Sequence, residues 1–282
     1  MGIDGILAVV VLYQCDLKDS ITLDTLNKSV MGSETASLNV LVYDNSEQSH
    51  SDADLSLFPC LSIDYKHDEL NPGVSKAYNI GAKRAKELNK SWLLVFDQDT
   101  TINIGYIQNL ISAKQKYKTH QLIVPQLFQG ETLISPCKYS YKRGSGLLRI
   151  GSGVNSLKNK SLLNSGIAIK LDLFDKVNGF DQDVKLYFSD FVFVDKLRKE
   201  VSEFVVLDDV FLHEMSSNDE LDLKTFYGRL LLYCKGAKEA ASHTNFIGKI
   251  NYLLICLFRV FKVAVKHKSL LSFKCLKPFF NV

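Results

Sequence analysis

Residues 91–101, SWLLVFDQDTT, place an apolar run directly before two aspartates that are one residue apart. Residues 92–96 are all apolar, which is typical of a strand buried on both faces of a parallel sheet. Asp97 and Asp99 follow at the carboxyl end of this strand, where open α/β sheets bind their ligands. We therefore expect the chemistry of the protein at this end of the strand.

The two acids form a candidate metal site. Carboxylates separated by one residue at a strand end project to nearly the same side. Such a pair suits a hard divalent cation that keeps several waters and bridges a diphosphate, so Asp97 and Asp99 indicate Mg²⁺ or Mn²⁺. Pairs of this kind also occur in solvated turns, and the buried strand before them is what favours a site.

Strand-like and helix-like segments alternate around this stretch. Strands are expected at 5–13, 38–43, 62–65 and 122–128, and helices around 23–30, from 74 to 85 and at about 103–118. This alternation favours a doubly wound, mostly parallel α/β sheet. Residues 130–164 carry several glycines among Ser and Lys, which suggests hairpins or a mobile loop near the site.

The second half of the chain continues with less regular spacing. A short strand is expected at 167–170, helices at 172–177 and 187–199, a strand at 205–212 and a helix at 223–242. We expect an α/β domain at 1–222 and a helical extension at 223–282. The fold class is therefore α/β, with a central sheet flanked by helices.

Composition narrows the function. The 282 residues are 46% hydrophobic and 23% charged, which is ordinary for a folded protein. The net charge of +3 comes from nearly balanced totals, so no nucleic-acid partner is expected. Six cysteines without a C-x-x-C pair predict reduced thiols, and the first residues lack a signal-peptide pattern. We expect a cytoplasmic protein.

The extension has a different charge pattern, because every formal charge after Glu239 is Lys or Arg. Apolar residues recur at helical spacing on one face, namely Ile250, Leu254, Leu257, Phe261 and Val265, and basic residues at 259, 262 and 266 share another. The longest apolar run, 252–258, is far shorter than the ~20 residues that span a bilayer. The helix could lie on an anionic membrane surface at the cytoplasmic face of the inner membrane, or pack on the sheet, or do both.

Two further polar residues are candidates for nucleotide binding. Asp44 ends the second strand at the same sheet edge, where it could accept hydrogen bonds from a nucleobase or a ribose, or could cap a turn. Asn79 lies within a helix where its propensity is poor, so it either faces solvent or points toward the cleft. We favour the cleft for Asn79.

Asp190 and His213 are candidates of a different kind. Asp190 lies among aromatic residues, which would raise its pKa toward the range of a general base; the alternative is a helix cap or an ion pair. His213 ends an apolar strand, where it could bind a metal, although a lone histidine is more often structural.

Taken together, the pattern resembles family 2 glycosyltransferases of the GT-A fold, and within them the bacterial rhamnosyltransferase-like branch. The segments that carry the resemblance are AVVVLY (8–13), VYDNS (42–46), NPGVSKAYNIGAKRA (71–85), LLVFDQDT (93–100), NSGIAIK (164–170), GFD (179–181), YFSDFVFVDKLR (187–198) and LHEMSS (212–217). The sequence departs from the family at Leu12-Tyr13-Gln14, where Thr-Tyr-Asn is common, and at Ser189, where Glu often precedes the Asp.

The resemblance implies a role for each candidate. Asp44 would hold the base or ribose, and Asn79, Asp97, Ser165 and Gly166 would bind the nucleotide-sugar. Asp99 would be the more direct metal ligand beside Asp97, with His213 completing the metal site. Asp190 would be the catalytic base.

The resemblance also implies a reaction. A sugar would be transferred with inversion from a nucleotide-diphospho-sugar donor to a lipid-linked oligosaccharide acceptor, in the synthesis of a bacterial surface polysaccharide such as O-antigen or capsule. dTDP-L-rhamnose is the favoured donor and a UDP-sugar the alternative.

Two rival interpretations remain open. Asp97-x-Asp99-x-Thr101 also fits the D-x-D-x-T pattern of haloacid-dehalogenase-like phosphatases, in which the first Asp is a nucleophile; that pattern normally ends the first strand of its fold. The other rival is a non-catalytic subunit that binds a nucleotide-sugar at the membrane surface. The basic extension and the altered Ser189-Asp190 pair favour it.

Overall fold

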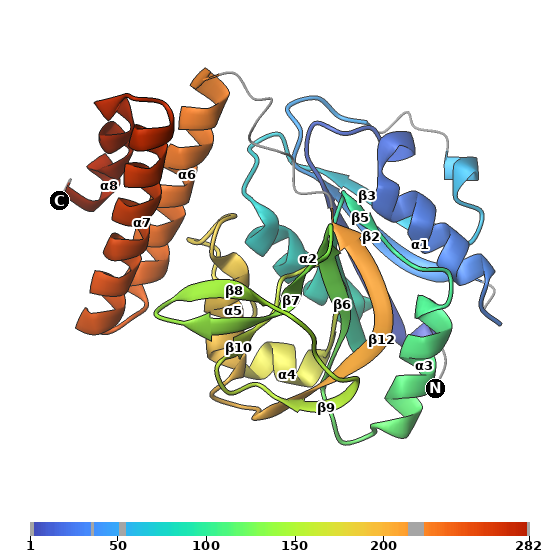
Figure 1. Cartoon of the computed structure of the whole chain (residues 1–282). Helices are drawn as coiled ribbons and strands as arrows, with labels where there is room; N and C mark the ends of the chain where they lie inside the picture. The colour runs from blue at the N-terminus through green and yellow to red at the C-terminus, as the bar shows by residue number, and fades with distance from the viewer. Residues whose placement is uncertain (1–2, 35–36, 51–54, 214–222, 281–282) are drawn as a thin grey trace.

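The apolar run before the aspartates forms strand β4 (Trp92–Asp97), at the centre of a sheet in the computed structural model, which describes residues 3–34, 37–50, 55–213 and 223–280 (Figure 1). β1 (Ile6–Leu12), β2 (Leu38–Asp44) and β3 (Leu61–His67) lie beside it, each parallel to its neighbour. In this register β1 residue Val11 pairs with Asp97 and its neighbour Leu12 pairs with Asp44. The ends of β2 and β4 therefore bring both acids to one edge.

The other half of the sheet is mixed. β11 (Ile167–Lys170) runs antiparallel between β4 and β6 (Leu122–Gln129), and β12 (Glu203–His213) runs parallel to β6. The last residues of β12 pair with β5 (Thr100–Thr101), with His213 opposite Thr100. This pairing carries β12 back to the aspartates, although it lies more than a hundred residues later in the chain.

The glycine-rich segment forms short strands, which agrees with the first of the two predicted alternatives, hairpins or a mobile loop. They are β7 (Thr132–Ser140), β8 (Arg143–Leu147), β9 (Gly153–Ser156) and β10 (Lys160–Ser161). β7 pairs antiparallel with β6, β8 and β10, and β9 pairs with β12. Parallel pairing is thus confined to β3-β2-β1-β4 and β6-β12, because the later strands return through hairpins and loops rather than through crossover helices.

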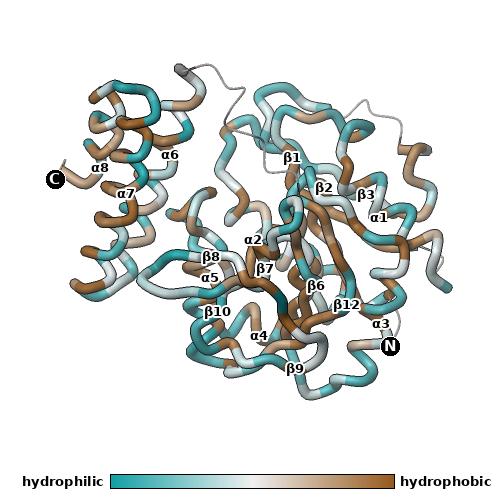
Figure 2. The backbone as a smooth tube through the Cα atoms, in the orientation of Figure 1, coloured by the Kyte–Doolittle hydropathy of each residue, from teal (hydrophilic) through white to brown (hydrophobic). Residues whose placement is uncertain are grey.

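Helices cover both faces of the sheet. α1 (Ile21–Met31) and α3 (Tyr106–Lys116) pack on one face, and α2 (Val74–Glu87), α4 (Leu171–Lys176) and α5 (Ser189–Leu197) pack on the other. Alternate residues of β1 enter the two cores, with Val10 facing α1 and Val9 facing α2. Burial on both faces is why these strands read as continuous apolar runs (Figure 2).

The C-terminal helices form a third core. α6 (Leu223–Ser242), α7 (Phe246–Lys266), the 3₁₀ helix η4 (Leu270–Leu276) and α8 (Lys277–Phe280) pack together and against residues of α5 (Figure 1). Three shorter 3₁₀ helices, η1 (Ile3–Gly5), η2 (Leu17–Asp19) and η3 (Leu55–Leu57), lie in the first domain. The predicted boundary at 222/223 stays a prediction, because 214–222 lie outside the described residues.

No helix in the described parts of the chain is both long and apolar enough to cross a membrane. The predicted α/β fold class is confirmed. The predicted helix at 187–199 begins two residues later than expected, because Phe188 adopts a left-handed backbone conformation with φ 71°.

Gly81 offers a test of the packing between α2 and β1. A Cβ at this position would lie 2.2 Å from Cγ2 of Val9, a stiff and fully buried side chain. Gly81→Ala should therefore lower the free energy of unfolding by about 1–3 kcal/mol through overpacking, measured by urea denaturation. Gly228 in α6 has no atom within 4 Å of such a Cβ, so Gly228→Ala should stabilise by about 0.5–1 kcal/mol through helix propensity. Equal effects of the two substitutions would contradict this packing.

Candidate functional site

Asp97 is fixed at the sheet edge by three hydrogen bonds. Its backbone N–H donates to Oγ of Ser165 at 2.9 Å, and its carbonyl accepts from the hydroxyl of Thr22 at 2.6 Å. Its carboxylate Oδ1 accepts from the Tyr78 hydroxyl at 2.9 Å. Helix α1, helix α2 and the turn before β11 therefore all converge on one residue.

Asp99 lies beside His213, as the resemblance implied. Oδ1 of Asp99 is 3.4 Å from Nδ1 of His213, and the same ring nitrogen is 3.2 Å from the Thr100 hydroxyl. Thr100 in turn bonds Oγ of Ser165 at 2.7 Å. The β5–β12 pairing that creates this contact joins segments far apart in sequence, so it could not be seen in the sequence itself.

The donor atoms here suit the expected cation in kind. The two carboxylates suit Mg²⁺ or Mn²⁺ with additional waters, whereas an imidazole is a ligand more typical of transition metals. Asp99 is partly exposed and His213 mostly buried, so a cation at Asp99 would be open on one side to a diphosphate. Asp97 stands further off, since donor atoms of the three residues do not all lie within 4.8 Å of one another.

In the described part of the chain, another group of acids and a histidine does have its donor atoms within 4.8 Å of one another. Asp181, Asp183 and His243 approach within 4.8 Å, with Nε2 of His243 3.0 Å from Asp181. Asp183 and His243 are exposed, and the pair joins the C-terminal helices to the loop before α5. We interpret this cluster as a surface ion pair.

Asp190 begins α5, and burial raises the pKa of its carboxyl from 3.8 to about 7. The negative charge of Asp97 raises the pKa of Asp190 further. A hydrogen bond from the N–H of Phe191 at 2.8 Å acts in the opposite direction but does not offset the burial. The sequence prediction of a raised pKa is thus consistent with the structure.

Tyr78 donates a hydrogen bond to Asp97 and was missed by sequence reasoning. Burial raises its pKa well above 10, with further contributions from the charges of Asp97, Asp99 and Asp190. The phenol therefore stays neutral and donates its proton to Asp97. Its place on the apolar face of the 71–85 helix was the available signal, but an aromatic residue there normally indicates core packing.

Asp44 lies beneath a pocket rather than on its wall. Its carboxylate is fully buried and accepts from Tyr65 at 2.6 Å and from the Ser46 N–H at 2.9 Å, and it lies 2.7 Å from Nδ1 of His50. Burial alone would raise its pKa, but these hydrogen bonds together lower it below 3.8. Its carboxylate is thus enclosed by contacts within the protein, and a direct contact with a base or ribose stays a prediction.

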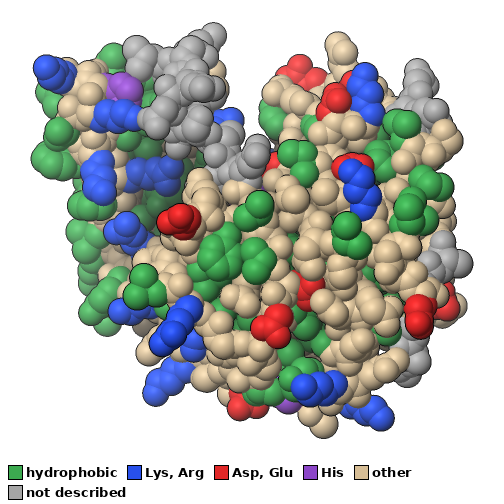
Figure 3. All heavy atoms as spheres, turned by 45° about the vertical axis from the view of Figure 1, so that its right-hand side comes forward, with side chains coloured by type: hydrophobic (Ala, Val, Ile, Leu, Met, Phe, Trp, Pro, Cys, Tyr) green, Lys and Arg blue, Asp and Glu red, His purple; other side chains and the backbone are tan. Residues whose placement is uncertain are grey.

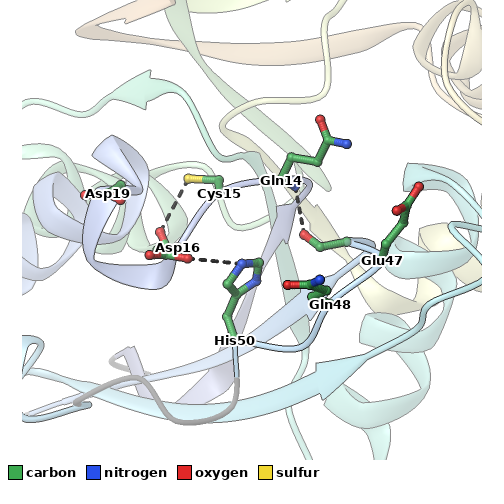
Figure 4. Close-up of a pocket in the computed structure, with 8 residues that line it drawn as sticks. Gln14, Cys15, Asp16, Asp19, Glu47, Gln48 and His50 are labelled. Atoms are coloured by element: carbon green, nitrogen blue, oxygen red, sulfur yellow. Dashed lines mark hydrogen bonds and ion pairs between the residues drawn. The ribbon is translucent and has the colours of Figure 1, made fainter.

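The pocket itself opens at the ends of β1 and β2 and has a volume of about 510 Å³ (Figure 4). His50 lies on its wall, with Nε2 3.0 Å from Oδ1 of Asp16. Glu47, Gln48 and Gln14 also line it. This size falls within the range of small-molecule sites. His50 and Asp16 were not among the residues predicted from the sequence.

Three other predicted binding residues act within the protein. Asn79 donates to the carbonyl of Phe180 at 2.9 Å and accepts from its N–H at 2.8 Å, so its amide fastens α2 to the 179–181 turn instead of pointing to the cleft. Ser165 supports Asp97 from behind. Gly166 is buried with φ 88°, and a Cβ there would lie 2.5 Å from the ring of Pro125.

Comparison with known proteins identifies the fold. No family model and no curated protein matches the sequence. The structure is similar to TarS from S. aureus, with a TM-score of 0.58 and 17% identity over 93% of this chain and 44% of TarS. TarS 1–349 in complex with UDP gives 0.54 at 16% identity, and its complex with UDP-GlcNAc gives 0.55 at 15%, over 89% of this chain and 69% and 70% of those chains.

These similarities establish the nucleotide-sugar transferase fold, as the resemblance implied. The chain spans less than half the length of full TarS. The phosphatase alternative loses its support, because β1, β2 and β3 all precede β4 in the chain, whereas its motif normally ends the first strand. The last residues of LHEMSS, 214–217, lie outside the described residues.

Asp190 makes the stability of the protein depend on pH. Its folded pKa of about 7 lies above the unfolded value near 3.8, so the folded state holds the proton over this interval. The free energy of unfolding should therefore fall as pH rises from about 4 to 7, by at most about 4 kcal/mol from this group. Asp190→Asn should remove that fall.

Urea denaturation of both proteins at pH 4.5, 6 and 8 checks this expectation. The gain from Asp190→Asn should be larger at pH 8 than at pH 4.5. Asp172→Asn, at an exposed position in α4, is the matched control and should give the same small effect at each pH. A gain from Asp190→Asn that does not change with pH would contradict the raised pKa.

Proposed function

We propose that the protein is a glycosyltransferase that moves a sugar from a nucleotide-diphospho-sugar to an acceptor hydroxyl, with inversion at the anomeric carbon. The observation that carries the proposal is the pair of contacts at the carboxyl edge of a sheet with the nucleotide-sugar transferase fold: buried Tyr78 donates a hydrogen bond to Asp97, and Asp99 lies beside His213. Ligands of open α/β sheets bind at that edge.

Each residue has a part in the reaction. The nucleotide lies in the pocket beside His50, and its diphosphate extends toward Asp97 and Asp99. Asp190 takes the proton of the acceptor hydroxyl, whose oxygen then attacks the anomeric carbon from the side opposite the diphosphate. Tyr78 holds Asp97 in place without neutralising it, since it donates a hydrogen bond and keeps no charge.

A divalent cation belongs to the same proposal. Asp99 and His213 would hold Mg²⁺ or Mn²⁺, with Asp97 reached through a water or the diphosphate. When bound, such a cation neutralises charge that develops on the departing diphosphate.

Two possible donors are proposed, one supported by similar structures and the other by sequence motifs. A UDP-sugar is supported by the complexes of the similar TarS structures with UDP and UDP-GlcNAc. dTDP-L-rhamnose is supported by the sequence motifs shared with the rhamnosyltransferase-like branch. We place the reaction in the cytoplasm, which six free thiols support, with a lipid-linked oligosaccharide of a bacterial surface polysaccharide as acceptor.

Thermal unfolding with a panel of UDP- and dTDP-sugars, with and without Mn²⁺, tests the donor site. A ligand at 100 times its Kd should add about 2.7 kcal/mol of stability. We expect a shift with one nucleotide class that increases with Mn²⁺, and Asp99→Asn should lose the increase. Asp183→Asn, which removes an exposed acid outside the site, should keep it. No shift with any nucleotide-sugar would contradict the proposal.

Asp190→Asn tests the catalytic base. Turnover should fall about 10²–10⁴-fold, because a positioned general base contributes that much, while the donor Kd stays unchanged. In the native protein kcat should rise with pH and level off above about 7, since only the deprotonated carboxylate accepts a proton.

The rate of transfer to an acceptor sugar distinguishes a catalytic protein from a non-catalytic subunit. It is measured for the native protein, for Asp190→Asn and for the control Asp172→Asn. Normal turnover of Asp190→Asn would remove its role. Native protein that binds nucleotide tightly yet transfers no sugar would instead support the non-catalytic subunit.

A further inference from the structure

We propose that the outer face of α7 binds the surface of an anionic membrane and that the acceptor reaches Asp190 from that surface. The second part rests on the proposed glycosyltransferase function. The first part rests on the exposed side chains and charge of the C-terminal helices alone.

A continuous apolar stripe runs along the solvent side of α7. Its members follow spacings of three and four residues, so they share one face of the helix, and each is between 40% and 67% exposed: Ile247, Ile250, Leu254, Phe258, Phe261 and Val265. The sequence prediction had placed Leu257 on this face, but Leu257 packs partly against the core and Phe258 takes its place.

This stripe is separate from the face that holds α7 to the protein. Tyr252, Cys256, Val260 and Val263 are the buried residues on the inner side, where they join the core formed with α6 and η4. The helix thus has two apolar faces, and only one is needed for folding. η4, which follows α7, adds three large exposed apolar residues, Leu270, Leu271 and Phe273.

Charge identifies what covers the stripe. Residues 240–282 contain seven Lys and Arg and no Asp or Glu. Lys249, Lys262 and Lys266 are exposed on α7, and the ammonium of Lys262 lies 4.7 Å from the Phe258 ring centroid. Figure 3 shows hydrophobic side chains along the outer flank of these helices, with Lys and Arg beside them.

An apolar strip bordered by cations fits an interface of lipid acyl chains and anionic headgroups. A second copy of the chain is disfavoured as the occupant, because pairing the same face with itself would bring like charges together.

The helix is also connected directly to the catalytic end of α5. The ring of Tyr252, on the inner side of α7, lies 5.4 Å from that of Phe188, and the ring of Tyr233 in α6 lies 4.8 Å from it. Phe188 caps α5 two residues before Asp190. A membrane that holds α7 therefore holds Asp190 at a fixed distance, which suits an acceptor carried on a lipid.

Sedimentation with vesicles tests the surface. The full chain should sediment with vesicles of phosphatidylglycerol and phosphatidylcholine in equal parts, remain in solution with phosphatidylcholine alone, and bind less at high salt. A triple variant of the stripe, Ile250→Ser, Leu254→Ser and Phe261→Ser, should abolish binding. Lys249→Gln and Lys262→Gln should each weaken it roughly fivefold.

Matched controls separate these effects from a general loss of hydrophobic or basic surface. Met31→Ser, Leu70→Ser and Leu148→Ser replace three apolar side chains that are at least as exposed but lie in the α/β domain. Lys118→Gln and Lys158→Gln are the charge controls, because each removes an exposed positive charge that lies outside α7. Both control sets should bind vesicles as the native protein does.

Two readouts keep this proposal distinguishable from the proposed function. Nucleotide-sugar binding by thermal unfolding should be unchanged in the stripe variant, which also shows that it is folded. Loss of transfer to an acceptor in vesicles, with transfer to a soluble acceptor retained, would support the delivery of acceptor from the membrane.

Equal binding to neutral vesicles, or binding that the stripe variant retains, would overturn the proposed surface. The proposed surface would also be overturned if the native protein bound no vesicles but formed a dimer, and if the stripe variant were a monomer. Vesicle binding without any sugar transfer would leave the surface in place while the proposed function fails.

Discussion

The point on which the structure depends is the end of β4, where a strand buried on both faces stops at Asp97. Burial fixes the strand, and its last residue is held by hydrogen bonds that Thr22 and Tyr78 donate to it and by one that it donates to Ser165. Because these three partners come from α1, α2 and the turn before β11, the packing of each element on the sheet also sets the geometry of the site. The site is therefore as rigid as the core beneath it.

The site holds several acidic side chains, whose mutual repulsion does not favour folding. Asp97, Asp99 and Asp190 all act on the buried phenol of Tyr78, and the charge of Asp97 raises the pKa of Asp190. Such arrangements reduce stability and are common where acids must carry out chemistry. Here the consequence is that the pKa of the Asp190 carboxyl lies near neutral pH, at about 7.

Local sequence patterns predicted the strands, the helices and the acid pair, because apolar periodicity and the end of a buried run are properties of neighbouring residues. These local patterns could not predict hydrogen-bond partners that come from distant segments of the chain. Nothing near Asn79 shows that Phe180 satisfies its amide, and nothing near Asp44 shows that Tyr65 and His50 enclose its carboxylate. In both cases the polar side chain forms its hydrogen bonds within the protein.

The same limit explains α7, where the apolar pattern was recognised but its direction was not determined. In β1 both apolar faces meet helices, so alternation between two cores accounts for every residue. In α7 only the face of Tyr252 and Cys256 meets a core, and the opposite stripe stays exposed beside cations. Hydrophobicity alone cannot separate these cases, since both read as apolar runs. What separates them is charge: β1 has none along its length, whereas α7 carries Lys249, Arg259, Lys262 and Lys266.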